Sequence, residues 1–199
     1  MLDQKKGEKL IKIARKELVS YLKGEEVERW DIKEKEFSKR SGVFVTLLDY
    51  PSKKLRGCIG FPTAQMPLWK SVIELVKSSA FEDPRFAPLT KEELNDIIIE
   101  ISVLTKPEQI KSKSEDLINE IEIGKDGLIL EYSGYSGLLL PQVPVEYKWD
   151  KEHFLEQLCL KAGVSPKTWK NFKCKIYKFQ AQIFSEISPG GEVKEIKLE

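Results

Sequence analysis

The run Ile97–Leu104 limits the possible folds of this 199-residue chain more than any other segment, because its residues alternate as in a β-strand. Glu100 and Ser102 fall on one face among apolar residues. The opposite face holds Ile97, Ile99, Ile101 and Val103. A carboxylate in mid-strand among apolar neighbours needs a partner, and Arg56 and Arg85 are candidates. Alternatively, Glu100 faces solvent on a one-sided antiparallel sheet.

A second strand signal, Leu55–Gly60, follows strand-like residues 43–48 across the turn Pro51–Lys54 and predicts an antiparallel hairpin. In this strand Arg56 and Cys58 would project from one face, and the large apolar residues would pack on the other. A cation beside a thiol lowers the pKa of the thiol, so Cys58 is a candidate nucleophile or redox centre. The alternative is a buried structural strand in which Cys58 is a small apolar residue.

Helical periodicity occurs in two places near these strands. Residues 8–23 predict an amphipathic helix that ends at Gly24, and Pro67 begins a second helix through Ser79. The first amides of that second helix could hold an anion near the end of the Leu55–Gly60 strand. The charged residues 25–40 lack periodicity and predict a surface connection.

Two proline-rich loops present polar side chains. In Glu82–Pro88, two prolines impose a rigid loop that presents Asp83 and Arg85. The two side chains form either a self-contained pair that staples the loop or a contact for a ligand. Residues 141–146 contain two prolines, which predict an extended segment that offers Gln142 and Glu146.

The remaining patterns predict short elements and one long strand. Asp150 would cap a helix with Cys159 in the core, and His153 in its first turn would lie at the surface. Ser114 would cap another helix. The expected elements are helix 115–118, strands 121–123, 128–132 and 138–140, a helix from Ser165–Pro166, and the strand Lys175–Ile187.

Composition argues against several classes of function. Lys and Arg total 33 against 32 Asp and Glu, so the net charge is +1 and no overall field attracts nucleic acid or an anionic membrane. We therefore expect no nucleic-acid partner and no membrane partner. No apolar run is long enough to span a bilayer, and residues 1–20 lack the pattern of a signal peptide, which predicts a cytoplasmic protein.

Potential metal ligands are few. The three cysteines Cys58, Cys159 and Cys174 show no C-x-x-C spacing, and His153 is the single histidine, so we expect no metal site. Charged residues make up 33% of the chain and are mostly Lys and Glu, a bias typical of hyperthermophile surfaces. Arginine is rare, which makes Arg56 and Arg85 notable as planar donors for a carboxylate or phosphate.

Several motifs together resemble the AMME-syndrome chromosomal-region (AMMECR-type) domain family, in unbroken order over nearly the whole chain. They include the run Leu55–Gly60, the tetrapeptide Asp83–Phe86 and the segment 137–143 with Glu146. The other matching segments are 41–47, 101–104, 154–159 and 161–163.

This resemblance implies an α+β fold with a mainly antiparallel sheet flanked by helices, and two subdomains with a cleft between them. It implies one AMMECR-type domain over residues 8–188, followed by a C-terminal tail, 189–199. The biochemical activity of the family is unestablished, and no cofactor follows from the resemblance. Family association suggests Memo-type or radical S-adenosylmethionine proteins as partners.

Two functions remain as hypotheses, and whether the chain is an enzyme stays open. The first is a small-molecule site, binding or enzymatic, that takes an anionic ligand around Arg56, with Cys58 and Glu146 as catalytic candidates. Its ligand-binding candidates are Arg56, Asp83, Arg85, Glu100 and Gln142. The second is a protein-interaction or assembly module in which Leu55–Gly60 is structural.

Overall fold

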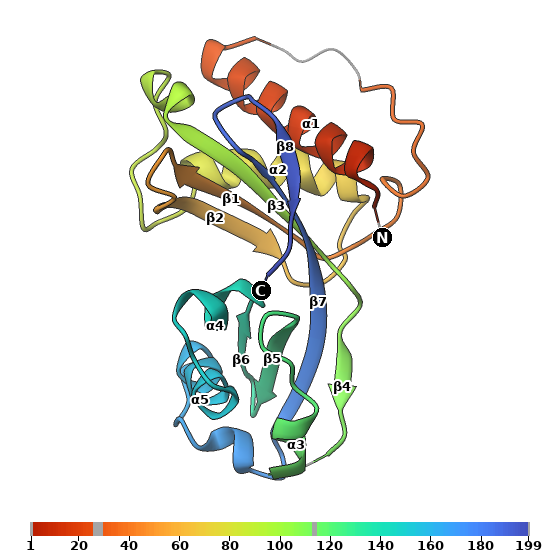
Figure 1. Ribbon diagram of the computed structural model, residues 1–199, viewed down its shortest axis with the longest axis vertical. Helices are drawn as coiled ribbons and strands as arrows, with labels where there is room; N and C mark the ends of the chain where they lie inside the picture. The colour runs from red at the N-terminus through yellow and green to blue at the C-terminus, as the bar shows by residue number, and fades with distance from the viewer. Residues whose placement is uncertain (1, 26–29, 113–114, 199) are drawn as a thin grey trace. The chain divides into compact units, whose positions relative to one another are not determined.

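The computed structural model describes residues 2–25, 30–112 and 115–198, and it confirms the predicted α+β class. The chain forms two compact units (Figure 1). The first comprises residues 1–104 and 182–196, and the second comprises residues 105–181 and 197–199. The long strand β7 (Lys175–Glu186) contributes its first half to the second unit and its second half to the first.

The first unit is a sheet with two helices on one face. Its strand order is β2-β1-β3-β7, β8 also pairs with β7, and β1 pairs antiparallel with both β2 and β3. The elements are α1 (Gln4–Lys23), β1 (Val43–Asp49), β2 (Leu55–Phe61), α2 (Leu68–Phe81), the 3-10 helix η1 (Glu92–Asn95), β3 (Ile97–Leu104) and β8 (Val193–Ile196).

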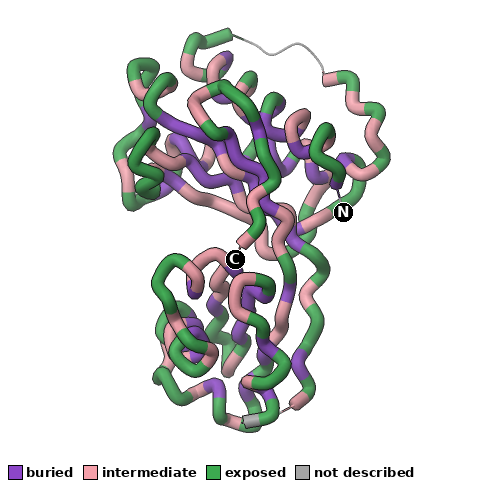
Figure 2. Tube along the Cα trace, in the orientation of Figure 1, coloured by how far each residue is buried: buried purple, intermediate pink, exposed green. Residues whose placement is uncertain are grey.

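The core of the first unit lies between the sheet and the helices α1 and α2. The inward residues of β1 and β3 are fully buried, and Figure 2 shows both strands as buried over much of their length. The helices contribute Leu10, Ile13, Leu18, Val72, Leu75 and Val76 to this core. The predicted Gly24 stop is confirmed, because Gly24 adopts a left-handed conformation with φ 73°.

The second unit has its own sheet and its own core. β4 (Glu108–Ile110) and β5 (Asp126–Tyr132) both pair antiparallel with β7, and β6 (Tyr135–Leu139) pairs with β5. The helices are α3 (Glu115–Asn119), α4 (Gln142–Glu146), α5 (Lys151–Lys161) and the 3-10 helix η2 (Thr168–Lys170). Leu128, Leu130 and Ile176 pack in this core with Phe154 and Leu158 of α5.

Several sequence predictions were wrong in detail. Residues 141–146 form a helical turn rather than an extended segment, because Pro141 is the N-cap of α4 and Pro144 lies in the first turn, where an amide has no helical acceptor. The connection 25–40 is not merely a surface segment, since Phe37 is fully buried in the first core. Residues 121–123 form no strand, and the predicted Ser114 cap lies outside the described residues. The strands β4 and β8 were not predicted.

Candidate functional site

A row of three polar side chains crosses the sheet of the first unit. In the strand register, Thr46 of β1 lies opposite Cys58 of β2 on one side and opposite Glu100 of β3 on the other. Val45 and Leu47 face the core beneath α2, so alternation along β1 directs Thr46 to the opposite face. Its cross-strand partners Cys58 and Glu100 lie on that face too. The sheet therefore brings a thiol, a hydroxyl and a carboxylate side by side.

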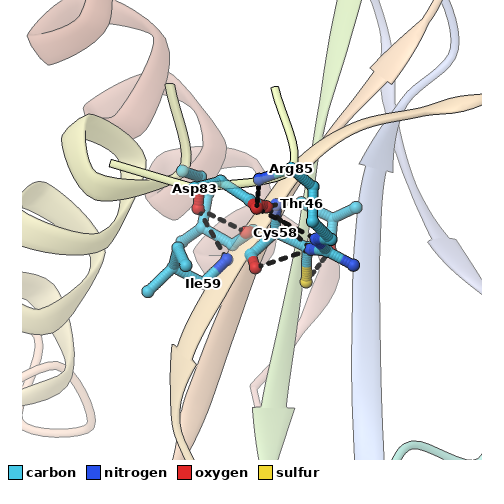
Figure 3. Close-up of polar contacts among 7 residues, drawn as sticks. Thr46, Cys58, Ile59, Asp83 and Arg85 are labelled. Atoms are coloured by element: carbon cyan, nitrogen blue, oxygen red, sulfur yellow. Dashed lines mark hydrogen bonds and ion pairs between the residues drawn. The ribbon is translucent and has the colours of Figure 1, made fainter. Parts of the chain in front are cut away.

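The thiol of Cys58 is partly buried, whereas Cys159 and Cys174 are buried. Thr46 donates a hydrogen bond from Oγ1 to Cys58 Sγ at 3.3 Å (Figure 3). Burial raises the pKa of the Cys58 thiol, and this effect exceeds the lowering by the Thr46 hydrogen bond and by the charge of Arg85. This direction is opposite to the lowering of the pKa that a neighbouring cation alone would cause, and the role of Cys58 stays a prediction.

Asp83 joins the 82–88 loop to the main chain of β2. Its buried carboxylate accepts hydrogen bonds from the Cys58 amide at 2.9 Å and from Arg85 Nε at 2.9 Å and Nη2 at 2.7 Å. Arg85 also donates from Nη2 to the Cys58 carbonyl at 3.3 Å. In Figure 3 both loop residues lie against Cys58. The loop thus binds the outward-facing amide and carbonyl of Cys58 on an edge strand.

The hydrogen bonds between Asp83 and Arg85 shift the pKa values of both side chains. The Arg85 hydrogen bonds hold the pKa of Asp83 well below its ordinary value, and Asp83 raises the pKa of Arg85. The Asp83 side chain is 2% exposed, but the Arg85 side chain is 52% exposed. Asp83 therefore fixes the orientation of a guanidinium that water can reach.

Arg56 lies at an irregularity in the β1–β2 register, between Leu55 and Gly57, and it is engaged by another element. Its Nε donates to Glu93 of η1 at 2.7 Å, and its Nη2 donates to the Ala87 carbonyl at 3.0 Å. Arg56 holds the pKa of Glu93 below its ordinary value. Its side chain is 13% exposed, and Nη1 has no hydrogen-bond partner among the described residues. Arg56 consequently braces the loop against β2, and Glu93 is a partner that the sequence did not reveal.

Ser79 of α2 is a second residue that the sequence analysis missed. Its Oγ accepts from the Ile59 amide at 3.0 Å and donates to the Val45 carbonyl at 2.8 Å, so the hydroxyl is inserted into the β1–β2 ladder. A Cβ on Gly57 would lie 2.1 Å from the Ser79 carbonyl oxygen. Gly57 is therefore required for the close approach of α2 to the strand. Two features of the sequence could have indicated this contact: a serine on the apolar face of the 67–79 helix, and a glycine inside the preceding strand.

The predicted anion site at the start of α2 was wrong. The Leu68 amide donates to the Lys39 carbonyl at 2.9 Å, and the Trp69 amide donates to the Phe37 carbonyl at 3.3 Å. The first amides of α2 are thus used by the segment that precedes the hairpin, which the sequence analysis had treated as a surface connection.

The two remaining candidates lie in the second unit. Gln142 begins α4 and is partly buried, whereas Glu146 ends α4 and is exposed. The predicted cleft and the participation of these two residues in the site stay predictions. His153 lies at the surface of α5, with its side chain 46% exposed.

No helix in residues 2–25, 30–112 and 115–198 is both long and apolar enough to cross a bilayer. Within the same ranges, no group of three or more His, Cys, Asp or Glu residues is arranged to hold a metal ion.

The chain is thus an α+β protein whose first sheet carries the Arg56-Gly57-Cys58 run on its edge strand β2. The family model of AMMECR1 matches residues 11–184, and the chain belongs to this family. The resemblance inferred from the motifs is thereby confirmed.

Archaeal proteins resemble the chain over its full length. Protein MJ0810 of Methanocaldococcus jannaschii is 48% identical over 199 residues, which cover 100% of this chain and 98% of that protein. Protein PH0010 of Pyrococcus horikoshii is 47% identical over 192 residues, which cover 94% of this chain and 93% of that protein. The crystal structure of PH0010, described as an uncharacterized protein, superposes with a TM-score of 0.94 at 46% identity and 99% coverage of both chains. No specific function is established by these relatives.

Proposed function

We propose that the chain binds a small anionic molecule on the face of the β2–β1–β3 sheet that bears Cys58, with Arg85 as the main contact. The observation that supports this most is that Arg85 is held by a buried carboxylate and is nevertheless 52% exposed. Nε and Nη2 of Arg85 donate to Asp83 and Cys58, so a carboxylate or a phosphate would be bound by the remaining Nη1 group, whose orientation these bonds fix. Asp83 offsets the charge of Arg85, so recognition would depend on directed hydrogen bonds rather than long-range attraction.

The other candidates have distinct roles in this proposal. Arg56 and Asp83 act as positioning residues, because their hydrogen bonds go to Glu93, Ala87, Cys58 and Arg85. Cys58 is the reactive group if a reaction occurs, and Glu100 of the same sheet would move the proton. Gln142 and Glu146 lie in the second unit, and their roles stay predictions from the sequence. The raised pKa favours the protonated thiol, so a covalent step at Cys58 would require removal of that proton.

Titration calorimetry with inorganic phosphate, acetate and citrate tests this proposal. We expect saturable binding of at least one probe and a loss of at least about tenfold in affinity for Arg85→Gln, the value of one charged hydrogen bond. Arg85→Lys should retain part of the affinity. Arg40→Gln, at an exposed arginine elsewhere in the first unit, is the matched control and should bind as the wild type does. Equal affinity of wild type and Arg85→Gln for every probe would contradict the proposal.

The packing of β2 against α2 favours a second candidate, a protein-interaction or assembly module. Gly57 and the Ile59 amide serve this packing through their contacts with Ser79, which is what a purely structural strand requires. Memo-type and radical S-adenosylmethionine proteins are partners to test, on the basis of family association. Pull-down with the purified chain should then recover a stoichiometric partner that substitutions in residues 82–88 abolish. Cys58→Ser should leave that complex intact.

A further inference from the structure

The charge of the chain is distributed unevenly. Between Gln157 and Ser185 the sequence contains six lysines and no Asp, Glu or Arg. These are Lys161, Lys167, Lys170, Lys173, Lys175 and Lys178. The net charge of +1 for the whole chain conceals this segment, because the compensating carboxylates lie elsewhere in the sequence. The expectation of no nucleic-acid partner depended in part on that overall balance.

The fold gathers most of these lysines at one end of the second unit. The end of α5, η2, the start of β7 and the β5–β6 turn all lie at the lower end of this unit in Figure 1. Lys173 and Lys175 line a depression of about 390 Å³ together with residues 131–136 of the β5–β6 hairpin. The lining also includes Ser133 and Ser136, whose hydroxyls suit a sugar or a phosphate oxygen, and the carboxylate residue Glu131.

One exposed aromatic side chain lines the depression, and a second is adjacent in sequence to a lining lysine. Phe172 is 76% exposed and precedes Lys173, and Tyr135 is 55% exposed and lines the depression itself. The ammonium of Lys173 is 5.7 Å from the centre of the Phe172 ring. Two carboxylates offset part of the positive charge nearby. Lys170 forms an ion pair with Glu152 at 3.0 Å, and Glu131 lies opposite Lys175 in the strand register.

We infer that this lysine–aromatic surface, formed by Tyr135, Phe172, Lys173 and Lys175, binds single-stranded nucleic acid. Exposed aromatic rings accept stacked bases of any sequence, and neighbouring lysines neutralise the phosphates between them. A lipid bilayer would not enter a depression walled by a polar hairpin. An acidic peptide would use the lysines but would gain less from two exposed rings. The inference is independent of the proposed anion site, which lies in the first unit.

Fluorescence anisotropy with a labelled twelve-nucleotide oligouridylate and with oligothymidylate of the same length tests the inference. Phe172→Ala should weaken binding about tenfold, since stacking on one ring is worth roughly 1–3 kcal/mol per base, and Phe172→Trp should restore binding. The double variant Lys173→Gln/Lys175→Gln should reduce the slope of log Kd against log salt by about 1.4, from ~0.7 per phosphate contact.

Matched variants and competing ligands decide between the outcomes. Lys12→Gln/Lys54→Gln makes the same change of charge at two exposed lysines of the first unit and should leave affinity and slope unchanged. Equal weakening by both double variants would overturn the inference, because it would indicate nonspecific attraction of a polyanion. An unchanged affinity in Phe172→Ala would overturn it too, because no base would then stack on this ring. Tighter binding of oligoglutamate or of phosphatidylserine vesicles than of either oligonucleotide would also overturn it. Phe172 is exposed, so circular dichroism should show its variants to be folded.

Discussion

At the scale of single residues, the hydroxyl of Thr46 is the direct partner of the Cys58 sulfur. Burial raises the pKa of the thiol, and the Thr46 hydrogen bond lowers it in part. Because the thiolate is the nucleophile, the alkylation rate of Cys58 reports this balance.

We therefore expect Thr46→Val to move the alkylation of Cys58 by iodoacetamide to higher pH. In the wild type, the pH at which the alkylation rate is half-maximal should lie above 9.0, the ordinary pKa of the thiol. In the variant this pH should be higher still. Mass spectrometry after timed labelling assigns the modification to Cys58 rather than to the buried Cys159 and Cys174. Thr63→Val, at an exposed threonine, is the control. A variant midpoint at or below that of the wild type would show that the Thr46 hydroxyl does not act on the sulfur.

Asp83 gives a prediction about pH and stability. Its pKa is lowered in the folded state from an ordinary 3.8, so its stabilising effect is complete above that value and is lost as the pH falls below it. Asp83→Asn should reduce the free energy of unfolding by about 2–3 kcal/mol at pH 7, the value of hydrogen bonds to a charged group. Chemical denaturation from pH 7 to pH 2 should show this difference shrinking toward acid. Asp96→Asn, at an exposed aspartate, should show no such trend.

At the scale of elements, the β1–β2 ladder depends on a side chain from α2. Ser79 satisfies the Ile59 amide and the Val45 carbonyl through one partly buried and one buried hydrogen bond. We expect Ser79→Ala to cost about 2–4 kcal/mol in the free energy of unfolding, because it leaves two main-chain groups unpaired. Ser78→Ala on the same helix is the matched control. A cost below about 0.5 kcal/mol, the usual limit for a harmless surface change, would show that the strands reclose without the hydroxyl.

The same elements show how far the sequence predicts the fold and the site. Ile97–Leu104 and Gly24 were predicted correctly, because alternation and the left-handed glycine stop are local signals. Residues 141–146 were mispredicted, because a single helical turn tolerates proline where no amide is needed. The site was predicted only in part. Simple alternation predicts Arg56 and Cys58 on one face, but it does not predict the register irregularity at Arg56. The Glu93 and Ser79 contacts depend on tertiary packing that no local pattern encodes.

At the scale of the whole molecule, the described residues divide into two hydrophobic cores that share no residue. One core lies between α1, α2 and the first sheet, and the other lies between α5 and the strands β5 and β7. β7 is the strand that contributes to both units. Local stability follows local packing, so each unit should open with its own free energy.

A pair of matched core substitutions tests this division by hydrogen exchange. Leu158→Ala in α5 should cost about 2–5 kcal/mol and should accelerate exchange at Leu128 and Leu130, while the β1 and β3 amides stay protected. Leu75→Ala in α2 removes the same atoms from the other core and should give the reverse pattern. Equal acceleration in both units by either variant would mean that β7 couples the two cores into one cooperative unit. A ligand of the first unit would then also stabilise the lysine–aromatic surface of the second, so the exchange pattern determines whether the two proposed binding surfaces can be energetically linked.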